Sequence, residues 1–391
     1  MKSVELKKDI YWVGAIDWDI RNFHGYLTQR GTTYNAYLIL DEKIVLVDTV
    51  KHYMFDEMLS RIKSIVDPAK IDYIISNHVE MDHSGCLPKI LELCPKAAVV
   101  TSPQGEKGLK KHFGNFINQN NLKIVESGDS INIGKRNINF VLTPMVHWPD
   151  SMASYIPEEK LLLPNDAFGQ HLATSVRFDD QLSWEIIKKE AAKYYANIVL
   201  PFGKQVNKAL DAVSGLTIDM IAPSHGIIWR KNIDKIINMY KKWANNETQN
   251  KAVIVYDSMW GSTEKIAREL YFVLEEKGNF TYLMNLKNNH ISDIMTEILD
   301  AKYICVGSPT LNNGMLPSVA AFLTYLKGLA PKNRIALAFG SYGWGGQSIT
   351  QVDDLLKSCG FNMLEQIKVQ YVPDTKTLKE IKEKLIKEIK S

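Results

Sequence analysis

The chain has 391 residues, a formal net charge of +3 and the apolar and charged fractions of a soluble globular protein. This length suits two or three domains, and because basic residues are interleaved with acidic ones, nucleic-acid binding is not expected. We see no apolar leader after Met1 and no run of about 18 apolar residues, so we expect neither a signal peptide nor a membrane span. Four cysteines without CxxC spacing form no rubredoxin-type or zinc-ribbon site, and they favour the cytoplasm.

The first part of the chain combines short β-branched runs with helical patterns. Residues 37–40 and 44–47 flank a short polar turn and are expected to pair as a hairpin, followed by a strand at 71–75. Helical patterns cover residues 54–66 and 87–93. A polar stretch without periodicity at 244–250 is interpreted as a linker. We therefore predict two domains, 1–248 and 249–391.

Strand and helix patterns alternate regularly after the linker. Strands are predicted at 252–256, 281–285, 303–307 and 334–339, and helices at 264–277, 317–326 and 346–359. This alternation predicts an α/β domain with a doubly wound parallel sheet and helices on both faces. The lysine-rich segment 376–390 has helical spacing and is interpreted as a solvated amphipathic helix.

A dense group of metal-ligand side chains follows the strand at 71–75. It consists of His78, Glu80, Asp82 and His83, and three further candidates, His147, Asp166 and His225, each follow an apolar run. Burying such groups together without a cation would cost on the order of several kcal/mol each, because charges and donors would stay unpaired. The set therefore predicts a site for two metal ions at one edge of a sheet sandwich.

The order of these ligands resembles that of the flavodiiron proteins, also called A-type flavoproteins. The resemblance rests on HxExDH at 78–83, a later histidine, the aspartate in 165–171 and the histidine in 223–226, and it covers almost the whole chain. It implies an N-terminal αββα metallo-β-lactamase-like sandwich before the flavodoxin-like domain. It also implies a di-iron centre with an oxo or hydroxo bridge. By this resemblance one iron is bound by His78, Glu80 and His147, the other by Asp82, His83 and His225, and Asp166 bridges them.

Glu80 bears on the choice of metal. Zinc hydrolases of the same superfamily usually carry a histidine at this position. A carboxylate is a harder, anionic donor that favours iron over zinc. Together with Asp82 and Asp166 it supplies three negative charges, which offset much of the charge of a di-iron centre.

Three residues are catalytic candidates around this centre. The resemblance places His24 near the substrate pocket, where it could donate a proton or a hydrogen bond. His171 follows Asp166 closely and could orient a ligand, although a lone histidine is more often a hydrogen-bonded structural residue. Tyr195 is similar to a pocket tyrosine of the family, although Tyr194 and Tyr195 also fit plain helix packing.

Three loops of the second domain, each after a predicted strand, lie where parallel sheets bind ligands. The first loop, 257–263, carries hydroxyls and a glycine before a helix, as a phosphate site does, although a simple helix cap is the alternative. It lacks the lysine of a nucleoside triphosphate loop. The set resembles a flavodoxin site for FMN, where Trp260, Tyr342 or Trp344 could pack near the ring. The expected FMN-binding residues are Ser258, Met259, Trp260, Gly261, Ser262, Thr263, Ser308, Pro309, Thr310, Leu311, Asn312, Asn313, Gly314, Ser341, Tyr342, Gly343, Trp344 and Gly345.

The resemblance implies a reductase of dioxygen to water, of nitric oxide to nitrous oxide, or of both. It also implies a head-to-tail homodimer or a dimer of dimers. No rubredoxin-like CxxC pair and no nicotinamide fingerprint occur, so a separate donor, a rubredoxin or a flavoprotein reductase, is expected to supply electrons. Two alternatives stay open: a zinc hydrolase with an appended flavodoxin-like module, and a non-enzymatic flavin electron carrier or gas sensor.

Overall fold

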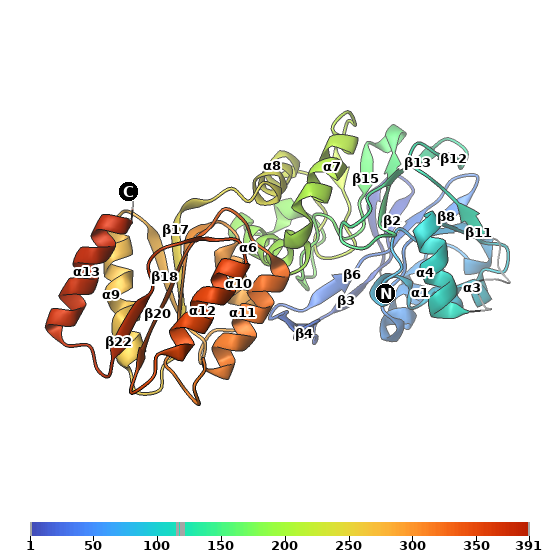
Figure 1. The fold of residues 1–391 in the computed structure, drawn as a ribbon. Coiled ribbons are helices and arrows are strands. Elements are labelled where there is room, and N and C mark those ends of the chain that lie inside the picture. Colours follow the sequence, from blue (N-terminus) through green and yellow to red (C-terminus); the bar gives the residue numbers. More distant parts are fainter. Residues whose placement is uncertain (1, 115–116, 118–121, 390–391) are drawn as a thin grey trace. The chain divides into compact units, whose positions relative to one another are not determined.

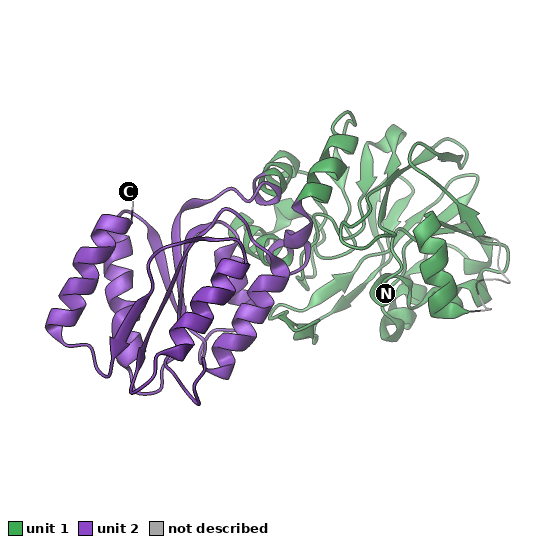
Figure 2. Ribbon diagram, viewed as in Figure 1, with its two compact units in different colours: residues 1–194, 204–241 green, residues 195–203, 242–391 purple. Residues whose placement is uncertain are grey.

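The structure is a computed structural model that describes residues 2–114, 117 and 122–389. It divides into two compact units, one of residues 1–194 and 204–241 and one of residues 195–203 and 242–391 (Figure 2). The sequence predicted two domains, 1–248 and 249–391, with one boundary between them. In the structure the segment 195–203 also belongs to unit 2. Packing explains this assignment, since Asn197 donates to the Ser292 carbonyl at 3.1 Å and accepts from the Tyr325 hydroxyl at 2.9 Å.

Unit 1 is built on two sheets (Figure 1). The seven-stranded sheet has the order β1 (Val4–Lys7), β2 (Ile10–Trp12), β7 (Tyr37–Ile39), β8 (Ile44–Val47), β9 (Ile71–Ile75), β10 (Ala98–Thr101), β11 (Leu122–Ile124). The five-stranded sheet has the order β12 (Ser130–Asn132), β13 (Asn137–Leu142), β14 (Met152–Ile156), β15 (Leu161–Leu163), β16 (Met220–Ile221). Two short pairs complete the unit, β3 (Ala15–Asp17) with β6 (Thr32–Tyr34) and β4 (Asn22–Phe23) with β5 (Tyr26–Leu27). The predicted hairpin is confirmed, because Tyr37 pairs with Val47 in an antiparallel register.

The apolar core of unit 1 has two layers, because both faces of the large sheet are covered. Tyr37 and Ile39 point into the core between the two sheets, whereas Leu38 points to the opposite face, as the period of two in a strand requires. That opposite face packs on the helices α1 (Phe55–Lys63), α3 (Leu87–Leu93) and α4 (Pro103–Phe113). On the far side of the five-stranded sheet, α7 (Gly203–Val213) lies over strands β14 and β15. The predicted αββα sandwich is confirmed.

Unit 2 is a parallel sheet between two layers of helices (Figure 1). The strand order is β18 (Phe280–Asn285), β17 (Gln249–Tyr256), β19 (Ala301–Gly307), β20 (Ile335–Tyr342), β21 (Asn362–Met363), and β22 (Ile367–Gln370) also pairs with β20. The helices are α9 (Ser262–Glu276), α10 (Ile291–Ile298), α11 (Pro317–Leu329), α12 (Gln347–Ser358) and α13 (Thr375–Glu388). One face of the sheet packs on α9 and α13, which confirms the amphipathic C-terminal helix and the doubly wound fold.

Several predicted boundaries in unit 2 are wrong. Strand β17 begins inside the expected linker, because Gln249 donates to the Asp300 carbonyl and pairs with Ala301. Strand β20 continues to Tyr342, because it pairs with β22, a strand that the sequence did not reveal. In both cases pairing with a remote strand overrides the local polar or glycine-rich composition. Among the described residues, no helix combines the length and the apolarity needed to cross a bilayer.

Candidate functional site

The predicted metal ligands of unit 1 lie just beyond the carboxyl ends of strands. Residues 78–83 follow β9 and continue into α2 (Met81–Ser84), while the other ligands follow β13, β15 and β16. Asn77 anchors the first loop, because its backbone N–H donates to Asp48 at 2.8 Å and its side-chain oxygen accepts from Ser154 at 2.8 Å. The loop is therefore tied to both sheets.

The structure brings the seven predicted ligands into two adjoining groups. One group is His78, Glu80, His147 and Asp166, the other is Asp82, His83 and His225, and the ligand atoms of each group lie within 4.8 Å of one another. Asp166 joins the groups. Its Oδ2 lies 3.2 Å from His147 Nε2, while its Oδ1 lies 3.1 Å from His83 Nε2. One carboxylate oxygen thus faces each group, which is the arrangement of a bridging ligand.

Unpartnered buried atoms show that this cluster fits metal ions. Both carboxylate oxygens of Asp82, both ring nitrogens of His83 and Oδ1 of Asp166 are buried, and among the described residues none of these atoms makes a hydrogen bond of acceptable geometry, although Asp166 Oδ1 lies close to His83 Nε2. Buried polar atoms almost always have partners, so several orphans at one point require an explanation. Cations would satisfy the oxygens of Asp82 and Asp166 and one ring nitrogen of His83. The carboxylates Glu80, Asp82 and Asp166 and the four imidazoles form a donor set typical of iron, as the sequence predicted.

Two histidines are oriented by groups outside the cluster. His78 donates from Nδ1 to Asp150 at 2.8 Å, and His225 donates from Nδ1 to the Thr33 carbonyl at 2.7 Å. These bonds hold each ring with Nε2 turned toward the cluster, where it is available to a metal ion. Asp150 and Thr33 were not among the predicted site residues. The signal for Asp150 was its place three residues after a predicted ligand, but Thr33 acts through its backbone and leaves no trace in residue type.

The charges of the cluster favour a cation strongly. Burial lowers the pKa of His78, but the carboxylates of Asp150 and Glu80 outweigh burial and raise it to about 10. The same balance raises the pKa of His147 to about 10 and that of His83 to about 9, with Asp166 contributing to both. Without metal the imidazoles hold protons against the carboxylates. Metal ions would take the place of those protons.

A second site lies in unit 2, at the carboxyl ends of its strands. A cavity of about 780 Å³ is lined by fourteen of the predicted FMN-binding residues, together with Tyr371 and Val372. The lining residues are Ser258, Met259, Trp260, Ser262, Pro309, Thr310, Leu311, Asn312, Asn313, Ser341, Tyr342, Gly343, Trp344 and Gly345. The indoles of Trp260 and Trp344 are each 92% exposed beside it. A cavity of this size, lined by two exposed tryptophans and by the first residue of helix α9, fits a planar ring with a phosphate.

The four remaining predicted FMN residues do not line the cavity but shape its loops. Gly261 caps α9 with a φ of 84°, a conformation that glycine adopts without strain. The Thr263 hydroxyl bonds to Ser341 Oγ at 3.1 Å and joins two of the loops. Ser308 accepts from the Leu316 N–H at 3.0 Å, which holds the third loop. Gly314 exchanges two backbone hydrogen bonds with Leu311 within that same loop. Tyr371 and Val372 were missed because strand β22 before them was not predicted.

Comparisons with known proteins match both parts of the chain. Residues 32–226 match the family described as ODP family beta lactamase, and residues 254–384 match flavodoxin. The chain is 50% identical over 378 residues to nitric oxide reductase of Moorella thermoacetica, covering 95% of this chain and 94% of the relative. It is 44% identical over 379 residues to rubredoxin-oxygen oxidoreductase of Megalodesulfovibrio gigas, covering 95% and 94%. A solved flavodiiron protein from Giardia intestinalis superposes with a TM-score of 0.96 at 34% identity, covering 99% and 96%.

The chain belongs to the flavodiiron protein family. This flavodiiron protein is an oxidoreductase, and its cofactors are FMN and a di-iron centre. The relatives give no support to a zinc hydrolase or to a non-enzymatic carrier.

Two of the three catalytic candidates lie beside the metal ligands of this flavodiiron protein. His24 Nε2 lies 2.8 Å from Glu80 Oε1, and its side chain is 68% exposed, so it stands between the cluster and the surface. His171 is buried with its ring 4.9 Å from that of His225 and its Nδ1 bonded to Thr32 at 2.7 Å. Burial lowers the pKa of His171 well below its ordinary value, so it is neutral and acts as a packed neighbour of His225.

Tyr194, the residue before the predicted Tyr195, lies beside two histidines of the site. The ring of Tyr194 lies 5.1 Å from His171 and 6.0 Å from His225. Tyr195 opens the π-helical segment η5 (Tyr195–Val199) of unit 2 and packs on Trp243 with 5.1 Å between ring centroids.

Proposed function

We propose that the protein reduces dioxygen to water, nitric oxide to nitrous oxide, or both, at the seven-ligand cluster, with electrons that pass through FMN. The observation that carries this proposal is the position of Asp166, whose two oxygens face the two ligand groups at 3.1 and 3.2 Å. Relatives named nitric oxide reductase and rubredoxin-oxygen oxidoreductase support these two substrates.

The electron count suits both gases. When bound, two ferrous ions and one reduced flavin supply four electrons, which is the number that converts one dioxygen into two waters, while two nitric oxide molecules require only two. The protein's own task is to hold the metals in place and to balance their charge. Glu80, Asp82 and Asp166 supply the negative charges, and the buried histidines occupy the remaining positions.

His24 is placed to serve proton delivery in this proposal. Its exposed ring contacts solvent, while its Nε2 lies 2.8 Å from the ligand Glu80. A proton taken up at the surface is thus held beside the cluster, where reduction of either gas consumes protons. In the same proposal His171 orients a ligand, because its ring packs against that of His225.

The electrons come from a separate donor in this proposal, a rubredoxin-type protein or a flavoprotein reductase. The name of the Megalodesulfovibrio relative supports the first choice. The chain's four cysteines lack CxxC spacing, so the chain itself offers no rubredoxin-type iron site. We place the protein in the cytoplasm, without nucleic-acid partners.

The same proposal includes a head-to-tail homodimer or a dimer of dimers. Trp260 and Trp344 are exposed at the FMN cavity, and Trp18, Tyr53 and Met81 are exposed in unit 1. Exposed apolar groups of this size are typical of protein interfaces. Light scattering tests this point, and a monomer with full turnover would contradict it.

Turnover of the iron-loaded and FMN-loaded protein under anaerobic conditions tests the function. With reduced rubredoxin as donor, oxygen and nitric oxide electrodes follow each gas, while peroxide and nitrous oxide are assayed as products. An Asp166→Asn variant keeps the side-chain shape and is expected to lose both activities, whereas Asp219→Asn, on the surface, is the matched control. If the loaded protein consumes neither gas, the proposal fails and an electron carrier takes its place; zinc alone in iron-replete protein would favour a hydrolase.

A further inference from the structure

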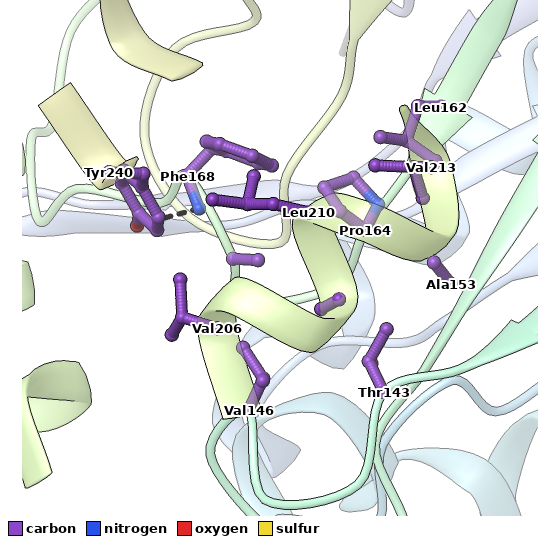
Figure 3. A pocket seen from close by; sticks show the side chains of 12 residues that line it. Thr143, Val146, Ala153, Leu162, Pro164, Phe168, Val206, Leu210, Val213 and Tyr240 are labelled. Atoms are coloured by element: carbon purple, nitrogen blue, oxygen red, sulfur yellow. Dashed lines mark hydrogen bonds between the residues drawn. The ribbon is translucent and has the colours of Figure 1, made fainter. Parts of the chain in front are cut away.

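A small apolar cavity, whose lining includes none of the seven predicted ligands, lies in unit 1 (Figure 3). This apolar cavity has a volume of about 30 Å³ and is bounded by the residues 143–146 and 164–168, strands β14 and β15, helix α7, and Tyr240 of α8 (Ile233–Ala244). A single water needs roughly 10–15 Å³ of such space, so a diatomic molecule fits and a larger metabolite does not.

The lining of the cavity is unsuited to water. The surface that it presents is apolar, with Val146, Leu162, Val206 and Leu210 among its side chains. The nearby Phe168 N–H is already bonded to the Tyr240 hydroxyl at 2.7 Å (Figure 3). A water needs two to four polar partners to stay in a cavity, whereas apolar cavities stay dry and accept apolar guests such as xenon.

The position of the cavity connects it with the metal ligands. Val146 immediately precedes the ligand His147, and Ala167 and Phe168 immediately follow the ligand Asp166. The two loops that line the cavity therefore also carry one terminal ligand and the bridging ligand. On the α7 side, Ala209 and Val213 are only half-buried, so the cavity approaches the surface there.

We propose that this apolar cavity takes up a small apolar gas molecule from the α7 surface and holds it on the way to the ligand cluster. The identity of that gas, dioxygen or nitric oxide, rests on the proposed function; the affinity for an apolar diatomic rests only on the lining. A gas of low polarity partitions from water into such a space because it gives up no hydrogen bonds on entry.

Two experiments on the metal-loaded and FMN-loaded protein test the inference. The first is a crystal structure under xenon pressure, in which we expect anomalous density between α7 and β15. The second compares Ala209→Phe, which fills the cavity from α7, with Ala212→Phe, which adds the same ring on an exposed position of the same helix. We expect Ala209→Phe to raise the KM for the gas about fivefold, the equivalent of about 1 kcal/mol, with kcat at saturating gas and iron content unchanged.

Each outcome of the two experiments supports or overturns a stated part of the inference. Absence of xenon from the cavity overturns the inference, whatever the turnover. Xenon in the cavity with equal KM values for the two variants overturns the route to the cluster. If Ala209→Phe does not fold, Val213→Phe at the half-buried rim replaces it, with the same expectation. If the wild-type protein consumes neither gas, the proposed function fails by itself, and xenon then reports on the gas site alone.

Discussion

Removal of the Asp150 carboxylate tests how the metal centre is held. Asp150 Oδ2 accepts both from His78 Nδ1 and from the Val79 N–H, each at 2.8 Å, and the residue is only 4% exposed. Asp150→Ala leaves two buried donors unsatisfied at about 1–3 kcal/mol each, so we expect the metal-free protein to lose about 2–6 kcal/mol of unfolding free energy. We also expect iron affinity to fall about 10–100-fold, as for other groups that orient a ligand.

Asp150→Asn separates hydrogen bonding from charge. Its amide oxygen can accept both bonds in the same position, so we expect a smaller loss of about 1 kcal/mol from the missing charge. Urea unfolding of the metal-free protein and competition with an iron chelator measure the two effects. Asp129→Ala is the matched control, because Asp129 accepts the Glu126 N–H at 2.8 Å in an exposed turn far from any ligand in the sequence. Wild-type iron affinity in Asp150→Ala would refute the reasoning.

Three further predictions concern the metal, the flavin and pH. Glu80→His restores the ligand of the zinc hydrolases, so we expect more bound zinc and less gas consumption; iron content and turnover at wild-type level would contradict this. Thr263→Val removes the hydroxyl that bonds to Ser341, and we expect FMN affinity, followed by flavin fluorescence, to fall about tenfold, with the exposed Thr324→Val unchanged. In the metal-free protein the pKa of His78 is raised to about 10 from 6.5, so its stabilising contribution is complete below pH 6.5 and is lost as pH rises through about 10. The urea concentration at the unfolding midpoint should therefore decrease as the pH rises from 7 to 10, and it should decrease less in Asp150→Ala. An equal decrease in the two proteins would contradict the pairing of His78 with Asp150.

The ligand residues could be recognised from the sequence because their positions follow local rules. Apolar runs predicted the strands, and the polar residues just after them, at 78–83, 147, 166 and 225, were gathered by the common edge of the sheets. The flavin loops followed the same rule. Where a strand was too short to recognise, as in β22 with four residues, the rule failed and Tyr371 was missed.

The sequence by itself thus determined which residue types follow the strands and in which order. These are the two sets of metal ligands, with a carboxylate at Glu80 where zinc enzymes have histidine, and the glycine-rich loops for FMN. The tertiary structure alone decided which Asp166 oxygen faces which group, that Tyr194 adjoins His225, and that Asp150 and the Thr33 carbonyl orient two histidines. The apolar cavity under α7 also exists only in the tertiary structure, because its lining residues come from separate segments of the chain. The physical reason is that periodicity encodes the conformation of one segment, whereas these distances join residues far apart in the chain and depend on how sheets and helices pack.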